Sequence, residues 1–240
     1  AVEAETDGMR RADTRFGLVN SHTSYTYTAT ERNPSGSLQN PGGEPKQILP
    51  VQGTGHQTTA VLRGAASVAA SSSGNWLFQL PQYDPVNAFD GDPRTAWAEG
   101  SPGEPAGQWL RVDFTAPTDI PASLRLTPLP GDATRPAPTR VRIETDRGSV
   151  DSKLRPDGER QSVRAPEGRA KWLKIEILDA ESARPGLSGA GFSEVAVPGV
   201  RVTRLLALPT DAEGTHADAQ VYSLHRGTDP GGLAPASTEA

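Results

Sequence analysis

The sequence predicts an all-β protein whose strands form an antiparallel sandwich. Short stretches of alternating apolar and polar residues recur at regular intervals, each bounded by Gly, Pro or Asp, and no long helical pattern separates them. The clearest stretch is Lys171–Leu178, in which Leu173, Ile175 and Ile177 are expected to face the core and Lys174 the solvent. Such a series of strands is typical of a sandwich or barrel.

Few elements are expected before the acidic stretch Asn87–Trp97, which lies near the middle of the chain. Thr6 and Asp7 are a plausible cap for a helical turn over Gly8–Phe16, and Asp84-Pro85 is a good start for another. Strand character marks three segments: Val19–Thr28, Gln57–Leu62 and Ala65–Ser72.

After the acidic stretch, strands are expected at short intervals. Leu110, Val112 and Phe114 should point to one side of the first of them, with Arg111 and Asp113 on the other. The later strands are expected at Ser123–Leu129, Thr139–Thr145, Ser149–Leu154, Gln161–Arg164, Lys171–Leu178 and Gly191–Val197. Two more, Val200–Leu208 and Gln220–His225, are expected to pair with Val19–Thr28 and to extend the sandwich.

Four regions follow from this pattern. Residues 1–64 are expected to form an N-terminal extension that packs on the sandwich, and residues 65–199 the sandwich itself. Residues 200–225 supply C-terminal strands, and 226–240, rich in Gly, Pro, Ala, Ser and Thr, are expected to be a mobile tail. The chain reads as a fragment of a longer protein.

Composition excludes several classes of partner. The 24 basic and 29 acidic residues give a net charge of −5 without any Lys/Arg block, so nucleic acid is not expected as a partner. No apolar run approaches the roughly 20 residues of a membrane span, so the fragment is not expected to insert into a bilayer. The absence of Cys excludes disulfides and thiolate chemistry.

No catalytic constellation is recognisable in the sequence. Gly186–Ala190 approaches a nucleophile elbow but lacks its final Gly, and no strand-to-helix context surrounds it. The four histidines, His22, His56, His216 and His225, are not spaced as metalloprotease ligands. The fragment is therefore expected not to be an enzyme.

The acidic stretch Asn87–Trp97 is followed by the strand segment Gly107–Phe114. A tight acidic turn that ends on Trp is thus followed by the motif W-x-x-V-D-φ, where φ is apolar. This order resembles the discoidin or coagulation-factor type C domain and related galactose-binding-like carbohydrate-binding modules. The resemblance covers about residues 65–199, and it implies a jelly-roll-like, galactose-binding-domain-like sandwich with strand extensions at both ends.

The acidic turn is a candidate calcium site. Asp90, Asp92 and Thr95 offer oxygen ligands, and Gly91 permits a tight backbone. The resemblance implies a structural calcium ion here, with Glu194 as a further ligand. The alternative is a turn without an ion, in which Asp90 caps the backbone and Thr95 bonds to it.

A candidate sugar site lies between the first core strand and the acidic turn. Exposed aromatic rings and nearby amides are the groups that bind pyranose and furanose sugars, and this segment has Trp76, Tyr83, Asn75 and Gln79. The alternative is that Trp76 is a core residue. The resemblance places the other tryptophans, Trp97, Trp109 and Trp172, in the core.

Flanking segments narrow the resemblance. Five segments are similar to the extracytoplasmic region of actinobacterial membrane α-(1→3)-arabinofuranosyltransferases: Asp7–Arg11, Phe16–Val19, Ser24–Thr26, Leu80–Pro85 and Val197–Arg201. That similarity implies a non-catalytic accessory module that binds an arabinose- or galactose-containing cell-envelope glycan, outside the cytoplasm and within a larger membrane-anchored protein. The alternative is a structural spacer that binds no ligand.

Overall fold

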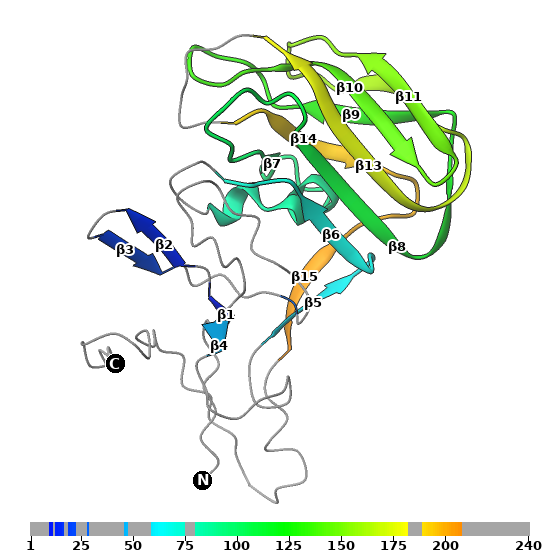
Figure 1. The fold of residues 1–240 in the computed structure, drawn as a ribbon. Coiled ribbons are helices and arrows are strands. Elements are labelled where there is room, and N and C mark those ends of the chain that lie inside the picture. Colours follow the sequence, from blue (N-terminus) through cyan, green and yellow to red (C-terminus); the bar gives the residue numbers. More distant parts are fainter. Residues whose placement is uncertain are drawn as a thin grey trace, which may run out of the picture.

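Two β-sheets face one another in the computed structural model (Figure 1). The structure describes residues 59–74, 80–181 and 189–207, together with Thr28 and the backbone of four short N-terminal strands. The described chain has no α-helix, and its strands pair antiparallel in both sheets. The predicted all-β antiparallel sandwich is confirmed.

The larger sheet has five strands in the order β11-β10-β13-β8-β6. Its centre is formed by two long strands, β8 and β13, which pair from Glu176 opposite Trp109 to Gly168 opposite Ile120. The strands are β6 (Ser67–Ala70), β8 (Trp109–Ile120), β10 (Pro138–Thr145), β11 (Gly148–Lys153) and β13 (Gly168–Ala180).

The smaller sheet has four strands in the order β12-β9-β14-β7. They are β7 (Trp97–Ala98), β9 (Ser123–Pro128), β12 (Gln161–Arg164) and β14 (Gly191–Ala196). All these strands overlap segments that the alternation predicted, except β7, which is too short to show a period.

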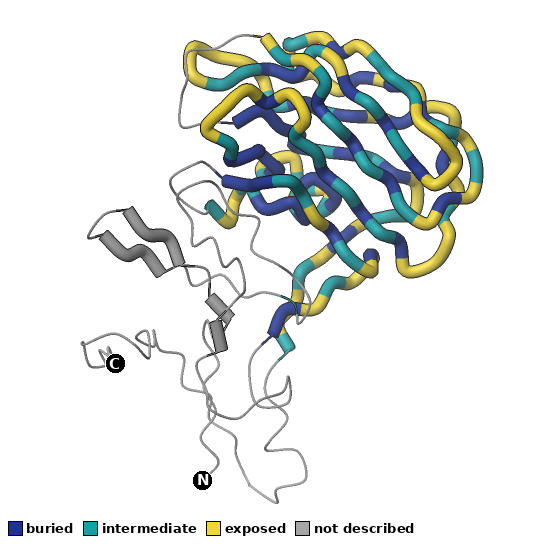
Figure 2. The backbone as a smooth tube through the Cα atoms, viewed as in Figure 1, coloured by how far each residue is buried: buried dark blue, intermediate teal, exposed yellow. Residues whose placement is uncertain are grey.

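The core lies between the two sheets, where the tube view is darkest (Figure 2). In the paired central parts of β8 and β13 every second residue is buried, as alternation requires. The six residues predicted to share one core do so; they are Leu110, Val112, Phe114, Leu173, Ile175 and Ile177.

Trp97 occupies the end of this core. Its ring is fully buried and stacks on Phe192 with 6.0 Å between the ring centroids, and its indole N–H donates to the main-chain oxygen of Ser72 at 3.0 Å. β14 approaches β7 so closely that a Cβ on Gly191 would lie 1.9 Å from the Trp97 main-chain oxygen. Only glycine fits there.

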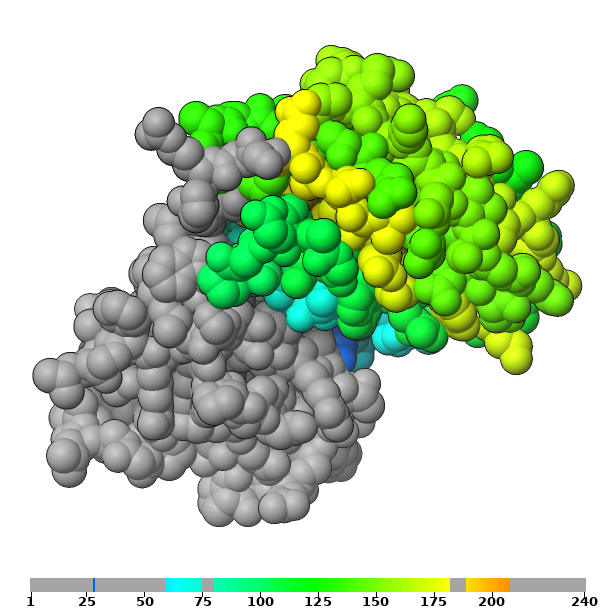
Figure 3. All heavy atoms as spheres, turned by 45° about the horizontal axis from the view of Figure 1, so that its top comes forward, coloured from blue at the N-terminus to red at the C-terminus, as the bar shows by residue number. Residues whose placement is uncertain are grey.

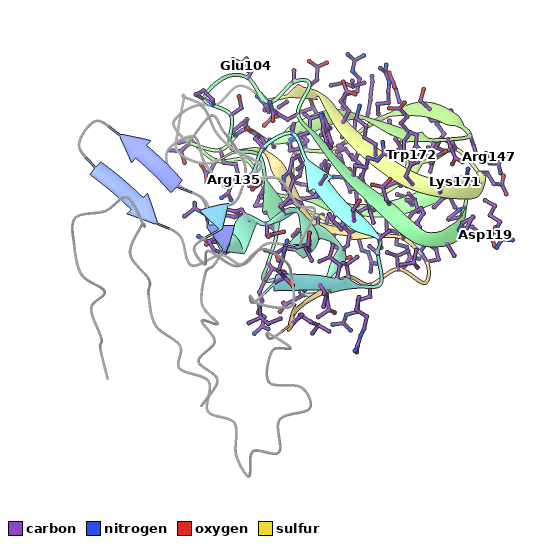
Figure 4. The ribbon with its side chains drawn as sticks, turned by 60° about the horizontal axis from the view of Figure 1, so that its bottom comes forward. Glu104, Asp119, Arg135, Arg147, Lys171 and Trp172 are labelled. Carbon is purple, nitrogen blue, oxygen red and sulfur yellow. The ribbon has the colours of Figure 1, made fainter. Side chains whose placement is uncertain are left out.

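The expectation that Trp109 and Trp172 are core residues is wrong. Both are half-buried and stand on the outer face of the five-stranded sheet, because they share strand parity with the polar residues of β8 and β13. Figure 3 shows a face of the molecule that includes β13, in yellow, and Figure 4 labels Trp172.

A separate two-stranded ladder joins β5 (Thr59–Arg63) to β15 (Thr203–Ala207). The expectation that the strand after residue 200 pairs with Val19–Thr28 is therefore wrong for β15, whose register partner is β5. Thr28 instead forms an isolated parallel bridge with Ala60. The predicted strand Gln220–His225 and the expected mobile tail 226–240 lie outside the described residues.

The helical turn expected over Gly8–Phe16 is also wrong. Two strands occupy this segment, β1 (Arg10–Arg11), paired with β4 (Lys46–Gln47), and β2 (Asp13–Phe16), paired with β3 (Val19–His22). A cap residue favours a helix only weakly, and pairing between β2 and β3 satisfies the same backbone groups. None of the described helical segments is long and apolar enough to cross a membrane.

Candidate functional site

The loops at one end of the sandwich bring together residues that are far apart in the sequence. The segment after β9 and the 3-10 segment η2 (Pro81–Tyr83) meet there, since Tyr83 contacts Arg135. Figure 4 shows Arg135 and Glu104 toward one end of the sandwich, while Asp119, Arg147 and Lys171 mark the opposite end. We call the end with Arg135 the loop end.

Tyr83 and Arg135 form an aromatic–guanidinium pair at the loop end. The Arg135 Nη2 donates to the Tyr83 hydroxyl at 3.1 Å, and the guanidinium carbon lies 5.8 Å from the ring centroid. Both residues are half-buried, so part of each remains accessible. The buried Nε of Arg135 has no hydrogen-bond partner among the described residues.

A turn closed by Asp132 positions Arg135. The Asp132 carboxylate accepts from the backbone N–H of Thr134 at 2.7 Å and of Arg135 at 2.8 Å. These hydrogen bonds, that from Thr134 first, lower the pKa of Asp132 below its usual value. The turn therefore fixes the backbone from which Arg135 reaches Tyr83. The three other residues of the predicted sugar site, Asn75, Trp76 and Gln79, lie outside the described residues.

The 3-10 segment η3 (Pro85–Phe89) leads into the acidic turn, and its predicted cap is confirmed. The Asp84 carboxylate accepts from the Val86 N–H at 2.8 Å. Arg204 of β15 reaches the same carboxylate at 3.2 Å. Burial raises the pKa of Asp84, although Arg204 opposes that change. This ion pair ties η3 to β15.

Hydrogen bonds within the acidic turn hold it closed. Asp90 Oδ1 accepts from the Asp92 N–H at 2.7 Å. The Thr95 hydroxyl lies 2.8 Å from Asp90 Oδ2 and 2.9 Å from the Asp92 main-chain oxygen, and it donates to one of them. The Asp92 side chain turns to Arg94, whose Nη2 lies 2.7 Å away, and this contact lowers the pKa of Asp92 to about 2. Arg201 donates to the Asp90 main-chain oxygen at 2.7 Å.

The structure brings Glu194 of β14 to the acidic turn. Burial raises the pKa of Glu194, and the charge of Asp90 raises it further. Arg160, Arg201 and the Gly91 N–H act in the opposite direction. Asp90 and Glu194 are thus two carboxylates in one electrostatic environment. Among the described residues, no group of three Asp, Glu, His or Cys side chains is arranged as a metal site.

Glu99 is a buried carboxyl group that the sequence did not reveal. It is 2% exposed, and its two oxygens accept from the N–H groups of Ser101 at 2.7 Å and Ala190 at 3.3 Å. Burial raises the pKa of Glu99 to about 7, although these two hydrogen bonds oppose the change. Glu99 therefore joins the segments that follow β7 and precede β14. No motif marks it, because a single Glu after a two-residue strand carries no pattern.

The outer face of the five-stranded sheet carries aromatic and charged side chains together. The guanidinium of Arg111 lies 4.4 Å from the Trp172 ring centroid and is held by Asp113, with Nη2 2.6 Å from Oδ1. Lys174 lies 5.9 Å from the Trp109 ring centroid. A cation thus approaches each ring on this outer sheet face.

Residues 67–188, half of the chain, match the F5/8 type C domain, and the chain belongs to this family. A curated relative is the α-(1→3)-arabinofuranosyltransferase of Mycobacterium tuberculosis strain ATCC 25618 / H37Rv, with 28% identity over 204 residues. The alignment covers 81% of this chain but only 13% of that enzyme.

Solved structures of a mycobacterial enzyme show the same fold. A cryo-EM structure of arabinofuranosyltransferase AftD from Mycobacteria superposes with a TM-score of 0.61 at 18% identity. A mutant of AftD gives a TM-score of 0.63 at 22% identity. Both superpositions cover 86% of this chain and 16% of the enzyme chain. The chain therefore spans a small part of the relatives that it resembles.

Proposed function

We propose that this chain is a non-catalytic carbohydrate-binding module that recognises an arabinose- or galactose-containing glycan of the cell envelope. The observation that carries the proposal is the accessible Tyr83–Arg135 pair at the loop end. A tyrosine ring offers an apolar face to sugar C–H groups, and a guanidinium donates to hydroxyls. Family membership and the similarity to part of an arabinofuranosyltransferase support this choice of ligand.

Trp76, Asn75 and Gln79 belong to the proposed site on sequence grounds. They precede Tyr83 by four to eight positions and supply one more aromatic ring and two amides. The affinity is expected to be weak, because an open face buries few sugar atoms and each hydroxyl gives up water for its new partner. A dissociation constant on the order of 0.1–1 mM corresponds to about 4–5 kcal/mol.

Calorimetric titration with arabinan, galactan and mannan oligosaccharides tests the proposal. Tyr83→Ala should weaken binding about tenfold without lowering the melting temperature, whereas Tyr83→Phe should retain most of the affinity because it keeps the ring. Arg135→Gln removes the charged fork and should also weaken binding. Absence of binding at millimolar concentration, or equal binding by Tyr83→Ala, would reject this site.

We also propose a structural calcium ion at the acidic turn. Asp90 and Glu194 fit this role because each raises the local negative charge that a cation would offset, and Thr95 adds a neutral oxygen. Asp92 would contribute its carboxylate only after release from Arg94. The bound ion would tie the turn to β14 and add to the stability of the fold.

Melting curves with calcium and with a chelator test this second proposal. Calcium at one hundred times its dissociation constant should stabilise the folded chain by about 2.7 kcal/mol. Glu194→Gln should abolish that shift, while Asp157→Asn, which neutralises an aspartate outside the turn, should leave it intact. Superimposable curves for the unchanged chain with and without calcium would reject the ion.

The wider setting is proposed from the same relatives. The module would lie outside the cytoplasm, as part of a larger membrane-anchored arabinofuranosyltransferase in which other regions carry catalysis. A spacer role is favoured by one observation: Val61, Leu205 and Leu206 of the β5–β15 ladder are large apolar residues that remain exposed. If no glycan binds, this apolar ladder supports a role in packing against the rest of such a protein.

A further inference from the structure

A hollow lies at the edge of the sandwich where the two sheets come close. β11 and β12 are edge strands, each paired with a single neighbour in its sheet. The hollow beside them has a volume of about 440 Å3 and is open to solvent. The polar residues that line it are Arg140, Asp151, Ser152, Lys153, Ser162 and Arg164.

Arg164 links the two strand edges that frame the hollow. Its backbone N–H donates to the Ser152 hydroxyl oxygen at 3.2 Å, and its Nη2 lies 3.5 Å from the main-chain oxygen of Asp151. These contacts run from β12 to β11 and join the two strand edges that frame the hollow. The Ser152 hydroxyl accepts in this contact, and its own proton is free to be donated.

The lining has an excess of positive charge. Arg140, Lys153 and Arg164 contribute three cations, while Asp151 is the one carboxylate. That carboxylate is already engaged by Arg142, whose Nε lies 2.8 Å from it. The ammonium group of Lys153 has no ion-pair or hydrogen-bond partner among the residues that the structure describes. The hollow therefore has unsatisfied donors for an anion.

The sheet register places two of these cations directly opposite each other. Arg140 and Lys153 are register partners across β10 and β11, whereas the next pair on this face, Arg142 and Asp151, has opposite charges. Like charges in directly opposed positions are destabilising. Asp179 offsets this only in part, since it reaches Arg140 at 3.3 Å while its side chain is 63% exposed. A bound anion would relieve the repulsion.

We propose that this hollow binds an anionic group, a carboxylate or a phosphate, carried by an oligosaccharide. Arginine forks suit both groups, and the hydroxyls of Ser152 and Ser162 can bond to neighbouring sugar oxygens. A lipid headgroup is a less suitable carrier of the anion. The one apolar residue of the lining, Val163, is 3% exposed, so no apolar side chain of the lining is available to enter a bilayer. The choice of a sugar as carrier rests on the proposed function, but the site is separate from Tyr83.

The test is calorimetric titration of the chain with trigalacturonate, with its neutral methyl ester and with inorganic phosphate, together with sedimentation against phosphatidylglycerol vesicles. Trigalacturonate is expected to bind about tenfold more tightly than the ester and than phosphate, because charge and hydroxyl contacts act together. Lys153→Glu and Arg164→Gln should each remove this preference. The matched control Lys171→Glu, a charge reversal at the opposite end of the sandwich from Arg135 and outside the hollow, should retain it.

The same variant of Lys153 gives a second readout in the absence of ligand. Lys153→Glu replaces the like-charge pair by an opposite-charge pair with Arg140, so its melting temperature should rise above that of the unchanged chain. Gain of stability with loss of trigalacturonate binding would support the site. A fall in melting temperature together with unchanged binding would overturn it.

Three further results would overturn the proposal. They are equal binding of the ester and the acid, phosphate binding as tight as that of trigalacturonate, and vesicle binding that depends on Lys153. Failure here is distinguishable from failure at the loop end, since neutral arabinan binding should respond to Tyr83→Ala and not to Lys153→Glu.

Discussion

Replacement of Glu99 by glutamine should change how the stability of the fold depends on pH. Glu99 is 2% exposed, and burial raises the pKa of its carboxyl group from 4.5 to about 7. In the unfolded chain the group ionises near pH 4.5. Between these values only the unfolded chain loses the proton, so stability that is fully present below pH 4.5 is lost as the pH rises through 7.

The size of this effect follows from the two pKa values. Each pH unit in the interval corresponds to about 1.4 kcal/mol, so Glu99 should lower the free energy of unfolding by about 3 kcal/mol between about pH 4.5 and 7.5. That is a large part of the roughly 5–15 kcal/mol that stabilises a domain. The Glu99→Gln side chain cannot ionise, so the variant should not show this loss.

Urea unfolding of both proteins from about pH 4 to 8 measures the difference. The Glu99→Gln substitution would place an amide N–H₂ near a backbone N–H of Ser101 or Ala190, which costs about 1–3 kcal/mol at every pH. The decisive quantity is therefore the slope: the stability of the variant minus that of the unchanged chain should rise by about 3 kcal/mol across the interval. Parallel profiles would refute the reasoning.

Two further predictions concern the fold, and each compares a disruptive substitution with a milder control. Val112→Asp should abolish cooperative unfolding, because it places an unpaired carboxylate at a fully buried position. Val112→Ala should lower the free energy of unfolding by only about 2 kcal/mol. Urea unfolding followed by circular dichroism distinguishes the two variants. Arg204→Ala should lower stability by about 3–5 kcal/mol, because it leaves the buried Asp84 carboxylate without its ion-pair partner. The control Arg140→Ala breaks the exposed pair with Asp179 and should cost less than about 1 kcal/mol. Equal losses in thermal unfolding would contradict this ranking.

The strand pattern was predictable because alternation is a local property. Strict parity in β8 and β13 places Leu110 and Leu173 in the core, and the same parity places Trp109 and Trp172 outside it. Strand parity alone therefore predicts that these two tryptophans lie on the outer face of the sheet. Family resemblance obscured it, since tryptophan is usually considered a core residue regardless of the face on which it stands.

Pairing between distant segments was not predictable in the same way. The partner of β15 is β5, and the sequence of Thr203–Ala207 suits several possible neighbours equally well. Tyr83 was predicted as part of the candidate sugar site, but its contact with Arg135 was not predicted, because the two residues are 52 positions apart and no motif connects them. The hollow beside β11 likewise depends on how two sheets meet at an edge.

The β5–β15 ladder also determines how the sandwich would respond to mechanical tension. Thr59 is paired with Ala207 at the outer end of the ladder, and Arg63 with Thr203 at the inner end. The chain therefore approaches and leaves the sandwich side by side, as Figure 1 shows for β5 and β15. A force that separates the two flanking segments would open this ladder one residue pair at a time, in unzipping geometry. The sheets behind it would bear load only after the ladder had opened.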